Sequence, residues 1–492
     1  MKPLTSSVEF IIALCAGIAA AAGFAPLYWW PITFVAWSAF LYLLLTRKEK
    51  VWRIAFAFGF GTGAVSMGWI VHALAIDNMF LWAIPFAIVG FGLFFGIFSL
   101  LAALPVPKAP TLTRKLIAFA IAWTLAEMLR AVILTGFPWN LLGSIWTNTP
   151  AVLQIASVGG VYGLSFLSIL VFGVPVLLYS KKRMTSYAIL CVALLAVSLG
   201  QMRLIYAQNN ALTGIKVRLV QPNIPQSLKW NKDAAVLSFE KLIQMSRSPA
   251  EITHILWPEA SVQFYLPNDE DAREMTIHAL KQGQTLIAGT LRITPQNNFA
   301  NSIVILDDLG SIKGIYDKAH LVPFGEYVPL AKWLPLRKIV PIPEDVQAGQ
   351  GIKTIRIPNA PPAGLLICYE GIFPKQVVDA SARPKWLIIA TNDAWFGNSF
   401  GPHQHLAAAQ LRAVEEGLPI VRVANSGISA VIDPYGRVLN SLPLNTQGVL
   451  DSEVPLALEV PPPFARCSLS ILVSLLLSVL LVVLFMPKDA KL

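Results

Sequence analysis

Cys368 stands at a position that suits a nucleophile. It follows the apolar run 365–367, which we expect to be a short buried strand, and it precedes Tyr369 and Glu370. Helix-compatible sequence resumes at about Pro374. A nucleophile on a sharp strand-to-helix turn is exposed at the edge of a sheet, where free backbone N–H groups can hold an oxyanion. The alternative is a buried structural cysteine, since free cysteines are among the most buried residues.

Two other polar residues stand at the ends of expected strands. Glu259 closes the run 254–259, and Lys318 follows a strand within 315–320. A thiol has a pKa of about 8.5 and needs a base or a nearby cation to become a good nucleophile. A carboxylate can take its proton, and an ammonium can favour the thiolate and then neutralise a tetrahedral oxyanion. These three residue types suit nucleophilic catalysis, although their spacing alone does not show that they converge.

We expect no metal site. Of the four cysteines, Cys15, Cys191 and Cys467 lie in or beside apolar stretches, and no CxxC pair or His/Cys cluster occurs. His403 and His405 are two residues apart, so they would point in different directions on a helix, and no carboxylate pattern completes a site. We interpret both histidines as solvent-facing or structural.

The candidate residues lie in a long polar region, 207–465, in which short β-like runs alternate with helical stretches. We expect a mixed α/β layered domain there, and about 260 residues are enough to bury a core. Gly and Pro favour hairpin turns at 307–310 and 433–436. The expected strands are 215–220, 255–257, 285–288, 302–306, 365–367, 387–390, 420–423 and 429–432, and the expected helices are 234–246, 269–281 and 403–416.

The composition of the 492 residues indicates a membrane protein. Hydrophobic residues make up 55% and charged residues only 13% of the chain, and the mean hydropathy is +0.60. A net charge of +10 could suggest nucleic acid as a partner. However, much of the basic charge lies in short loops between apolar stretches, and no basic stripe alternates with aromatic residues. We therefore expect no nucleic-acid partner.

Eight apolar stretches are each near the ~20 residues that a helix needs to cross a bilayer. The first follows Lys2 and could be a cleaved signal peptide, with small residues near 20–22. Because a second apolar stretch follows almost at once, we favour a retained transmembrane helix. The stretches are 8–25, 31–45, 54–75, 80–104, 115–137, 158–179, 185–205 and 468–485.

The basic residues of the loops predict the orientation. Lys and Arg follow the second, fourth, sixth and eighth stretches, whereas the alternate loops, such as 76–78 and 138–150, carry none. By the positive-inside rule both termini are cytoplasmic and the polar region lies on the opposite face. This divides the chain into seven transmembrane helices in 1–206, an extracytoplasmic domain in 207–465, and a last transmembrane helix with a short cytoplasmic tail in 466–492.

Two charges lie inside the fifth apolar stretch. Glu127 and Arg130 are three residues apart, hence on one face of a helix. Two explanations stay open. The pair could be a structural ion pair that keeps both charges buried, or it could line a cavity or a lipid-headgroup site.

Local sequence strings add a resemblance to this residue-level argument. WPE, YDKAHLVPFGEYVP, ICYE, NDAWFG and RAVEEGLPIVRVANSGIS, in that order, resemble the nitrilase superfamily, and they cover most of 215–435. The resemblance implies an α-β-β-α sandwich and a Glu-Lys-Cys triad. By motif, Glu259 would be the general base, Lys318 the oxyanion partner and Cys368 the nucleophile. Glu326 would be a supporting carboxylate, and the backbone N–H of Tyr369 would share the oxyanion hole.

A nitrilase-like domain between seven apolar stretches and one more is similar to the bacterial apolipoprotein N-acyltransferase family. The strings AEMLRAVILTGFPW, LVQPNIPQSLKW and NDAWFGNSFGPHQH agree with it, so the resemblance spans essentially the whole chain. It implies that Trp230, Tyr369 and Glu370 surround the active site. Trp230 could equally be a membrane-interface anchor.

The resemblance also implies a reaction. Cys368 would take an acyl chain from a phospholipid, with phosphatidylethanolamine as the usual donor, and the thioester would pass it to the α-amine of a diacylglyceryl-cysteine at the amino terminus of an apolipoprotein. No metal or organic cofactor would be needed. The protein would be a multi-pass protein of the bacterial inner membrane, with its catalytic domain in the periplasm.

Two other functions remain open at this level. A membrane-anchored amidase or nitrilase-type hydrolase would share the triad but needs at most one membrane anchor. A non-catalytic scaffold or transporter could carry an inactive nitrilase-like domain, but the intact set of Glu259, Lys318 and Cys368 argues against that.

Overall fold

The computed structural model describes residues 5–47, 49–207, 212–229, 232–247, 251–329 and 346–485. The chain forms two compact units. The helical unit comprises Met1–Ala207 and Pro461–Leu492, and the sandwich unit comprises Gln208–Val460. Each is described here by itself.

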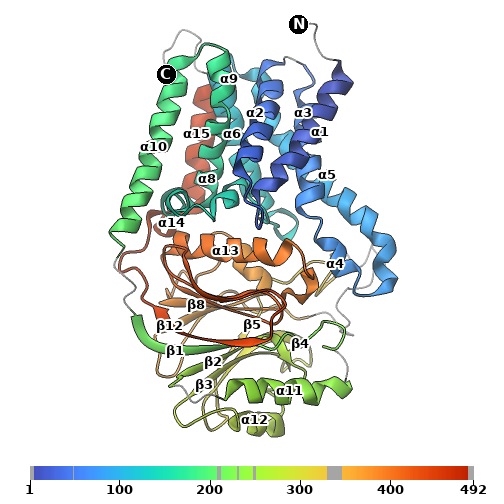
Figure 1. Cartoon of the computed structure of the whole chain (residues 1–492), viewed down its shortest axis with the longest axis vertical. Coiled ribbons are helices and arrows are strands. Elements are labelled where there is room, and N and C mark those ends of the chain that lie inside the picture. The colour runs from blue at the N-terminus through green and yellow to red at the C-terminus, as the bar shows by residue number, and fades with distance from the viewer. Residues whose placement is uncertain are drawn as a thin grey trace. The chain divides into compact units, whose positions relative to one another are not determined.

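The helical unit consists of apolar helices joined by short turns (Figure 1). A helix satisfies its backbone hydrogen bonds internally, which a long apolar segment requires once water is absent. The helices are α1 (Ser6–Ala20), α2 (Trp30–Thr46), α3 (Val51–Ser66), α4 (Ile70–Leu74), α5 (Ile84–Ala103), α6 (Leu112–Arg130), α7 (Pro150–Leu153), α8 (Ala156–Phe172), α9 (Val174–Tyr179), α10 (Arg183–Ile205), α14 (Pro463–Arg466) and α15 (Leu469–Phe485).

Each of the eight predicted stretches contains a helix, but the count of eight spans is not confirmed. Among the described residues, four helical stretches are long and apolar enough to cross a membrane, and α2 and α15 are shorter apolar helices. α3 has 16 residues, and α6 carries basic residues at its start and the Glu127 and Arg130 charges near its end. The four long stretches are Ser6–Gly23, Asn78–Lys108, Ala156–Tyr179 and Arg183–Ile205.

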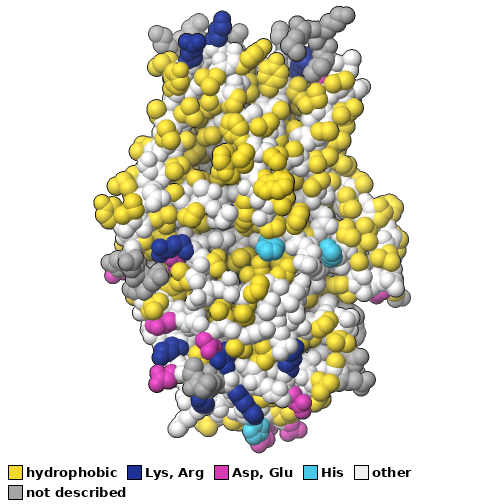
Figure 2. All heavy atoms as spheres, in the orientation of Figure 1, with side chains coloured by type: hydrophobic (Ala, Val, Ile, Leu, Met, Phe, Trp, Pro, Cys, Tyr) yellow, Lys and Arg dark blue, Asp and Glu magenta, His cyan; other side chains and the backbone are white. Residues whose placement is uncertain are grey.

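Aromatic side chains and close helix contacts hold the helical unit together. Trp37, Phe40 and Phe58 are fully buried in one cluster, with the rings of Phe40 and Phe58 stacked 3.9 Å apart. α1 approaches α3 so closely that a Cβ on Gly17 would lie 2.0 Å from the carbonyl oxygen of Phe58, so only glycine fits there. The visible outer face of this unit is covered mainly by hydrophobic side chains (Figure 2), as expected of a surface in contact with lipid.

The buried charges of α6 anchor the chain that follows it. Oε1 of Glu127 accepts hydrogen bonds from the indole N–H of Trp123 and from the backbone N–H of Leu142 (2.7 Å). Arg130 donates to the carbonyl oxygens of Phe137 and Trp139. Both charged residues also line a cavity of about 30 Å³. The structural and the cavity-lining explanations therefore both have a basis.

The sandwich unit is built from two six-stranded sheets. The first has the order β12-β1-β2-β3-β4-β5 and the second the order β11-β10-β9-β8-β7-β6. The first comprises β1 (Leu212–Gln221), β2 (His254–Val262), β3 (Thr285–Ile293), β4 (Phe299–Leu306), β5 (Ile312–Asp317) and β12 (Gly448–Pro455). The second comprises β6 (Thr354–Ile355), β7 (Ala363–Ile367), β8 (Trp386–Thr391), β9 (Ile420–Ala424), β10 (Ser429–Ile432) and β11 (Val438–Leu442).

Three cores bind the layers of this unit. Residues of both sheets, such as Leu256 and Leu365, form the core between them. α11 (Lys232–Ser246) and α12 (Glu270–Ile277) cover the outer face of the first sheet, and α13 (Gly401–Glu416) covers that of the second (Figure 1). The predicted α-β-β-α sandwich is confirmed.

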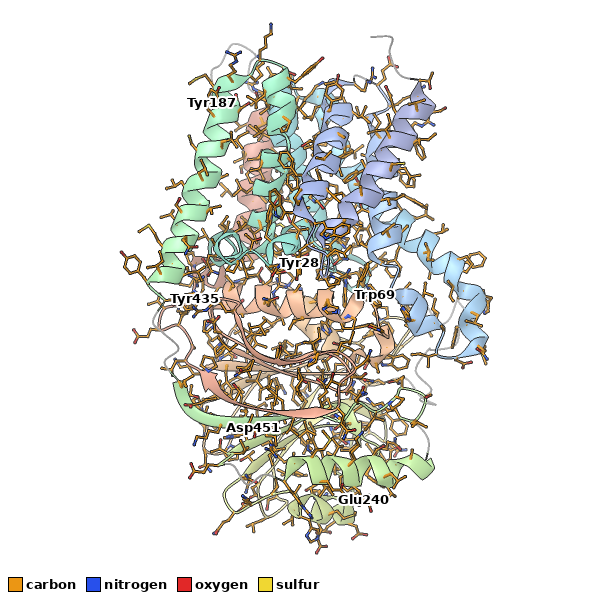
Figure 3. The ribbon with its side chains drawn as sticks, viewed as in Figure 1. Tyr28, Trp69, Tyr187, Glu240, Tyr435 and Asp451 are labelled. Carbon is orange, nitrogen blue, oxygen red and sulfur yellow. The ribbon has the colours of Figure 1, made fainter. Side chains whose placement is uncertain are left out.

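The eight strands predicted by range are present, and so is the strand expected before Lys318, which is β5. Three strands were missed: β6, β11 and β12. β12 pairs antiparallel with β1, and Asp451 on β12, labelled in Figure 3, forms an ion pair with Arg218 of β1 at 2.6 Å. The predicted helix 269–281 is shorter than expected, since α12 ends at Ile277.

Candidate active site

Cys368 lies on a tight turn directly after β7. It begins the 3-10 helix η6 (Cys368–Ile372), has a left-handed backbone with φ of 52°, and is only 7% exposed. A positive φ is uncommon for a residue with a side chain and marks a constrained turn. The prediction that helical structure resumes near Pro374 is wrong, because the turn at Cys368 is itself helical and no helix follows it among residues 374–385.

Glu259 lies on β2, where the strand loses its regular pairing. The register with β3 shifts between Trp257 and Val262. The backbone of β2 comes so close to β3 there that a Cβ on Gly289 would lie 2.2 Å from the carbonyl oxygen of Pro258. This irregularity gives Glu259 a buried position from which Oε2 accepts a hydrogen bond from the backbone N–H of Asn392, at 2.9 Å, across the sandwich.

Lys318 joins two carboxylates. It follows β5, is 1% exposed, and its Nζ lies 3.3 Å from Oε1 of Glu259 and 3.0 Å from Glu326. Asn301 of β4 donates to the same two carboxylates, at 2.9 and 3.0 Å. The second oxygen of Glu326 accepts from the backbone N–H of Val322 at 2.8 Å. Glu326 thus gives the lysine a second carboxylate partner besides Glu259.

These contacts determine the protonation of the site at rest. Burial would raise the pKa of Glu259, but the ammonium groups of Lys318 and Lys229 outweigh it and hold that pKa below its usual value. Burial opposes the charge of Lys318, but Glu326 and Glu259 raise its pKa. Burial and the charge of Glu259 raise the pKa of the Cys368 thiol. The resting site therefore holds a carboxylate, an ammonium and a neutral thiol.

Glu370 ties the nucleophile turn to the lysine segment. Oε2 accepts from the backbone N–H of Ile367 at 2.7 Å, while Oε1 accepts from the backbone N–H of Ala319 and His320 and from the hydroxyl of Tyr316. These partners flank Cys368 and Lys318 in the sequence. Burial raises the pKa of Glu370 to about 7.

Tyr369 is buried beside the nucleophile. Its ring packs edge-on against those of His320 and Phe373, at 5.6 and 5.1 Å. The structure thus places Glu259, Lys318, Glu326, Cys368, Tyr369 and Glu370 in one region. Trp230, the remaining residue predicted for the site, lies outside the described residues.

A buried charged cluster contacts the turn that carries Cys368. Nε2 of His405 donates to the carbonyl oxygen of Cys368 at 3.1 Å, and Nδ1 lies 2.9 Å from Asp393, which also pairs with Arg422. The structural interpretation of His405 is supported, and Asp393 is the carboxylate partner that the sequence pattern did not indicate. Cys368, Asp393 and His405 place potential metal-ligand atoms within 4.8 Å of one another. However, both ring nitrogens of His405 already form hydrogen bonds within the protein.

Sequence reasoning missed three site residues: Asn301, Asn392 and Lys229. Nζ of Lys229 donates to the backbone carbonyl of Glu259 at 2.9 Å. Asparagine and lysine in polar segments are ordinarily surface residues. A usable signal existed for Lys229 and Asn392, since they belong to the strings LVQPNIPQSLKW and NDAWFG that carry the family resemblance.

Comparison with known proteins identifies the family. The carbon-nitrogen hydrolase family model matches residues 216–460, and the model of the apolipoprotein N-acyltransferase N-terminal domain matches residues 16–174. Among solved structures, the chain is similar to a carbon-nitrogen hydrolase from Helicobacter pylori G27, with a TM-score of 0.37 and 15% identity over 49% of this chain and 89% of that one.

Curated relatives match nearly the whole length. The apolipoprotein N-acyltransferase of Rhodopseudomonas palustris is 35% identical, over 93% of this chain and 91% of the relative. That of Brucella melitensis is 37% identical, over 84% of this chain and 80% of the relative. The chain belongs to the apolipoprotein N-acyltransferase family.

Proposed function

We propose that this membrane protein moves a fatty acyl chain from a phospholipid to the α-amino group of the diacylglyceryl-cysteine at the amino terminus of an apolipoprotein. The names of its relatives and the match of its helical unit support N-acylation over simple hydrolysis. The observation that carries the mechanism is the buried ion pair of Lys318 and Glu259, since both charges act on the thiol of Cys368.

The first half-reaction loads the enzyme. Glu259 takes the thiol proton, and the sulfur of Cys368 attacks the carbonyl carbon of the phospholipid ester. Lys318 and the backbone N–H of Tyr369 stabilise the negative charge that develops on the carbonyl oxygen. The C–O bond then breaks, Glu259 returns the proton to the leaving oxygen, and a lysophospholipid departs. A thioester remains on Cys368.

The second half-reaction delivers the acyl chain. The neutral α-amine of the acceptor attacks the thioester, Glu259 takes a proton from the nitrogen, and the C–S bond breaks. The proton passes to the departing sulfur, so the thiol is regenerated and an amide is formed. Glu326 keeps the Lys318 ammonium in place throughout, and its two contacts to Lys318 and Asn301 support that role.

The location and the donor form part of the same proposal. The enzyme works in the bacterial inner membrane, with residues 207–465 in the periplasm, because Lys and Arg gather in alternate loops of the helical unit. Phosphatidylethanolamine is the proposed donor. Apolar helices support a membrane site, since both substrates are lipids and arrive from the bilayer.

Transfer is distinguished from hydrolysis by the fate of the thioester. Incubation with phosphatidylethanolamine alone should add one fatty acyl mass to the intact protein, at Cys368. A diacylglyceryl-cysteine peptide should then discharge the enzyme and become triacylated. Cys368→Ala should remain folded and membrane-inserted but should gain no mass.

A hydrolase would behave differently. Steady release of free fatty acid without peptide, at a rate equal to peptide-dependent turnover, would contradict the proposal. Acylation of the Cys368→Ala variant at the normal rate would contradict the covalent mechanism.

A further inference from the structure

Lys229 is a second buried ammonium at the site, and the mechanism above does not use it. It is 5% exposed, and its Nζ donates to the backbone carbonyl oxygen of Glu259 at 2.9 Å. Its charge also acts on the side chains of Glu259 and Cys368. A buried lysine is expensive to maintain unless its charge has compensating partners.

The segment that carries Lys229 is held by asparagines that follow strands of the second sheet. Asn425, which follows β9, accepts from the backbone N–H of Ile224 and donates to its carbonyl, at 3.0 and 2.8 Å. Asn392 donates its side-chain N–H to Gln226 at 2.8 Å, and its backbone N–H binds Glu259. One asparagine therefore connects the Lys229 segment to the carboxylate of the proposed base.

We propose that Lys229 is a positioning residue for the acyl-transfer reaction: it holds the backbone of Glu259 in place and supplies the second positive charge that lets the Cys368 thiolate form. This inference rests on the proposed function. Lys229 acts through Glu259 and Cys368, and no contact with substrate is required of it.

The charges around the thiol explain why one lysine is not enough. Nζ of Lys318 is shared between Glu259 and Glu326, so in this part of the described site the two carboxylates outnumber that ammonium. Lys229 restores the balance. When Glu259 takes the thiol proton, the negative charge moves to sulfur, where both ammonium groups can stabilise it.

The pH dependence of this arrangement involves a small set of groups. The charges that act on Lys229 belong to Glu259 on β2 and Cys368 on η6, and Lys318 acts on the same two groups. The charge of Asp393, which is paired with Arg422, also raises the pKa of the Cys368 thiol. Burial lowers the pKa of Lys229 to about 8, although Glu259 and Cys368 oppose that shift. Most of the Lys229 population is therefore charged at pH 7.

The test measures the reactivity of the thiol itself. The rate of Cys368 alkylation by iodoacetamide is followed by peptide-resolved mass spectrometry between pH 6 and 10, in the full-length protein. Lys229→Met removes the charge, so alkylation at pH 7 should slow about 10-fold, as if the lower part of the profile were shifted upward by about one pH unit. Above about pH 8, where Lys229 itself loses its proton, the two profiles should converge. Acylation by phosphatidylethanolamine should slow as well, whereas Lys229→Arg should stay close to wild type in both measurements.

Two further variants separate the possible causes. Lys229→Gln keeps a donor for the Glu259 carbonyl without a charge, so it should shift the profile even if Lys229→Met does not fold. Lys216→Met removes a partly exposed lysine of β1 that pairs with Glu251, and it should change neither measurement.

The outcomes are distinct. Slower acylation with an unshifted alkylation profile in the neutral variants would show a merely structural residue and overturn the inference. Unchanged rates in Lys229→Met would overturn it too. If wild-type protein forms no acyl-thioester, the proposed function fails, while the alkylation profile still decides the role of Lys229 on the thiol.

Discussion

Lys318 is the side chain on which the charges of the site converge, because it contacts both buried carboxylates. We predict that Lys318→Met lowers the rate of acylation by phosphatidylethanolamine roughly 100- to 1,000-fold, the usual loss when one oxyanion partner is removed. Single-turnover mass spectrometry measures this rate. Lys313 lies on β5, the strand that precedes Lys318, where it is partly exposed and pairs with Asp307. Lys313→Met is therefore the matched control and should stay near the wild-type rate. A loss of less than about threefold for Lys318→Met would contradict the assigned role.

Glu370 should give the protein a recognisable pH dependence. Its pKa is raised by burial from 4.5 to about 7 in the folded state, so the folded protein holds this proton more tightly than the unfolded chain does. The contribution of Glu370 to the free energy of unfolding is therefore greatest below about pH 4.5 and declines as the pH rises to about 7.

We predict that Glu370→Gln removes this decline. The thermal midpoint of the purified protein in detergent, measured from pH 4.5 to 7.5, should fall less steeply with pH for Glu370→Gln than for wild type. The variant should also be less active. Both carboxylate oxygens of Glu370 accept hydrogen bonds, and the amide nitrogen of glutamine cannot accept one from a donor such as the N–H of Ile367. Parallel pH curves for the two proteins would show that this carboxyl does not titrate as described.

At the residue scale, the sequence predicted the residues proposed to react, but it did not predict the residues that hold them in position. Cys368, Glu259 and Lys318 were selected from their chemistry and from their places at strand ends, and the structure brings them together. Asn392 and Lys229 reach the site from segments 133 and 30 residues away from Glu259. No local sequence pattern predicts such contacts, because they depend on how the two sheets face each other.

At the scale of elements, the irregularity of β2 is what places Glu259, and Gly289 of β3 permits it. We predict that Gly289→Ala lowers both the thermal midpoint and the acylation rate, since its Cβ would lie 2.2 Å from the carbonyl oxygen of Pro258 and must displace β2. Thermal unfolding and single-turnover acylation measure the two effects. Gly448→Ala, on β12 of the same sheet, meets only a flexible Leu442 side chain at 3.3 Å and should be tolerated. Equal behaviour of the two variants would contradict this account of β2.

The same scale shows which elements a sequence can predict. Buried strands such as β7 and β8 are continuous apolar runs, and they were found. β12 has a half-exposed, mixed sequence, and its place is determined by pairing with β1 more than 200 residues earlier in the chain. The false helix near Pro374 has a similar cause: the helical turn at Cys368 is fixed by Glu370 and its distant partners, which helix propensity does not register.

For the whole molecule, the decisive question is which side of the membrane holds the sandwich unit. The apolar helices of the helical unit indicate a membrane protein, but they do not by themselves determine its orientation in the membrane. Orientation follows from the Lys and Arg residues of the loops, because basic loops are retained in the cytoplasm. An even number of crossings after a cytoplasmic loop returns the chain to the cytoplasm, and an odd number does not.

We therefore predict that residues 207–465 are periplasmic. The loop at 181–183 carries three basic residues, and α10 is a single long apolar helix between that loop and the sandwich unit. A reporter that is active only in the periplasm, fused after Asn209, should be active, while the same reporter fused after Lys182 should be inactive. A reporter that is active only in the cytoplasm should give the opposite results at the two junctions. Cytoplasmic activity after Asn209 would reverse the orientation and remove access to a periplasmic apolipoprotein, and with it the proposed acceptor.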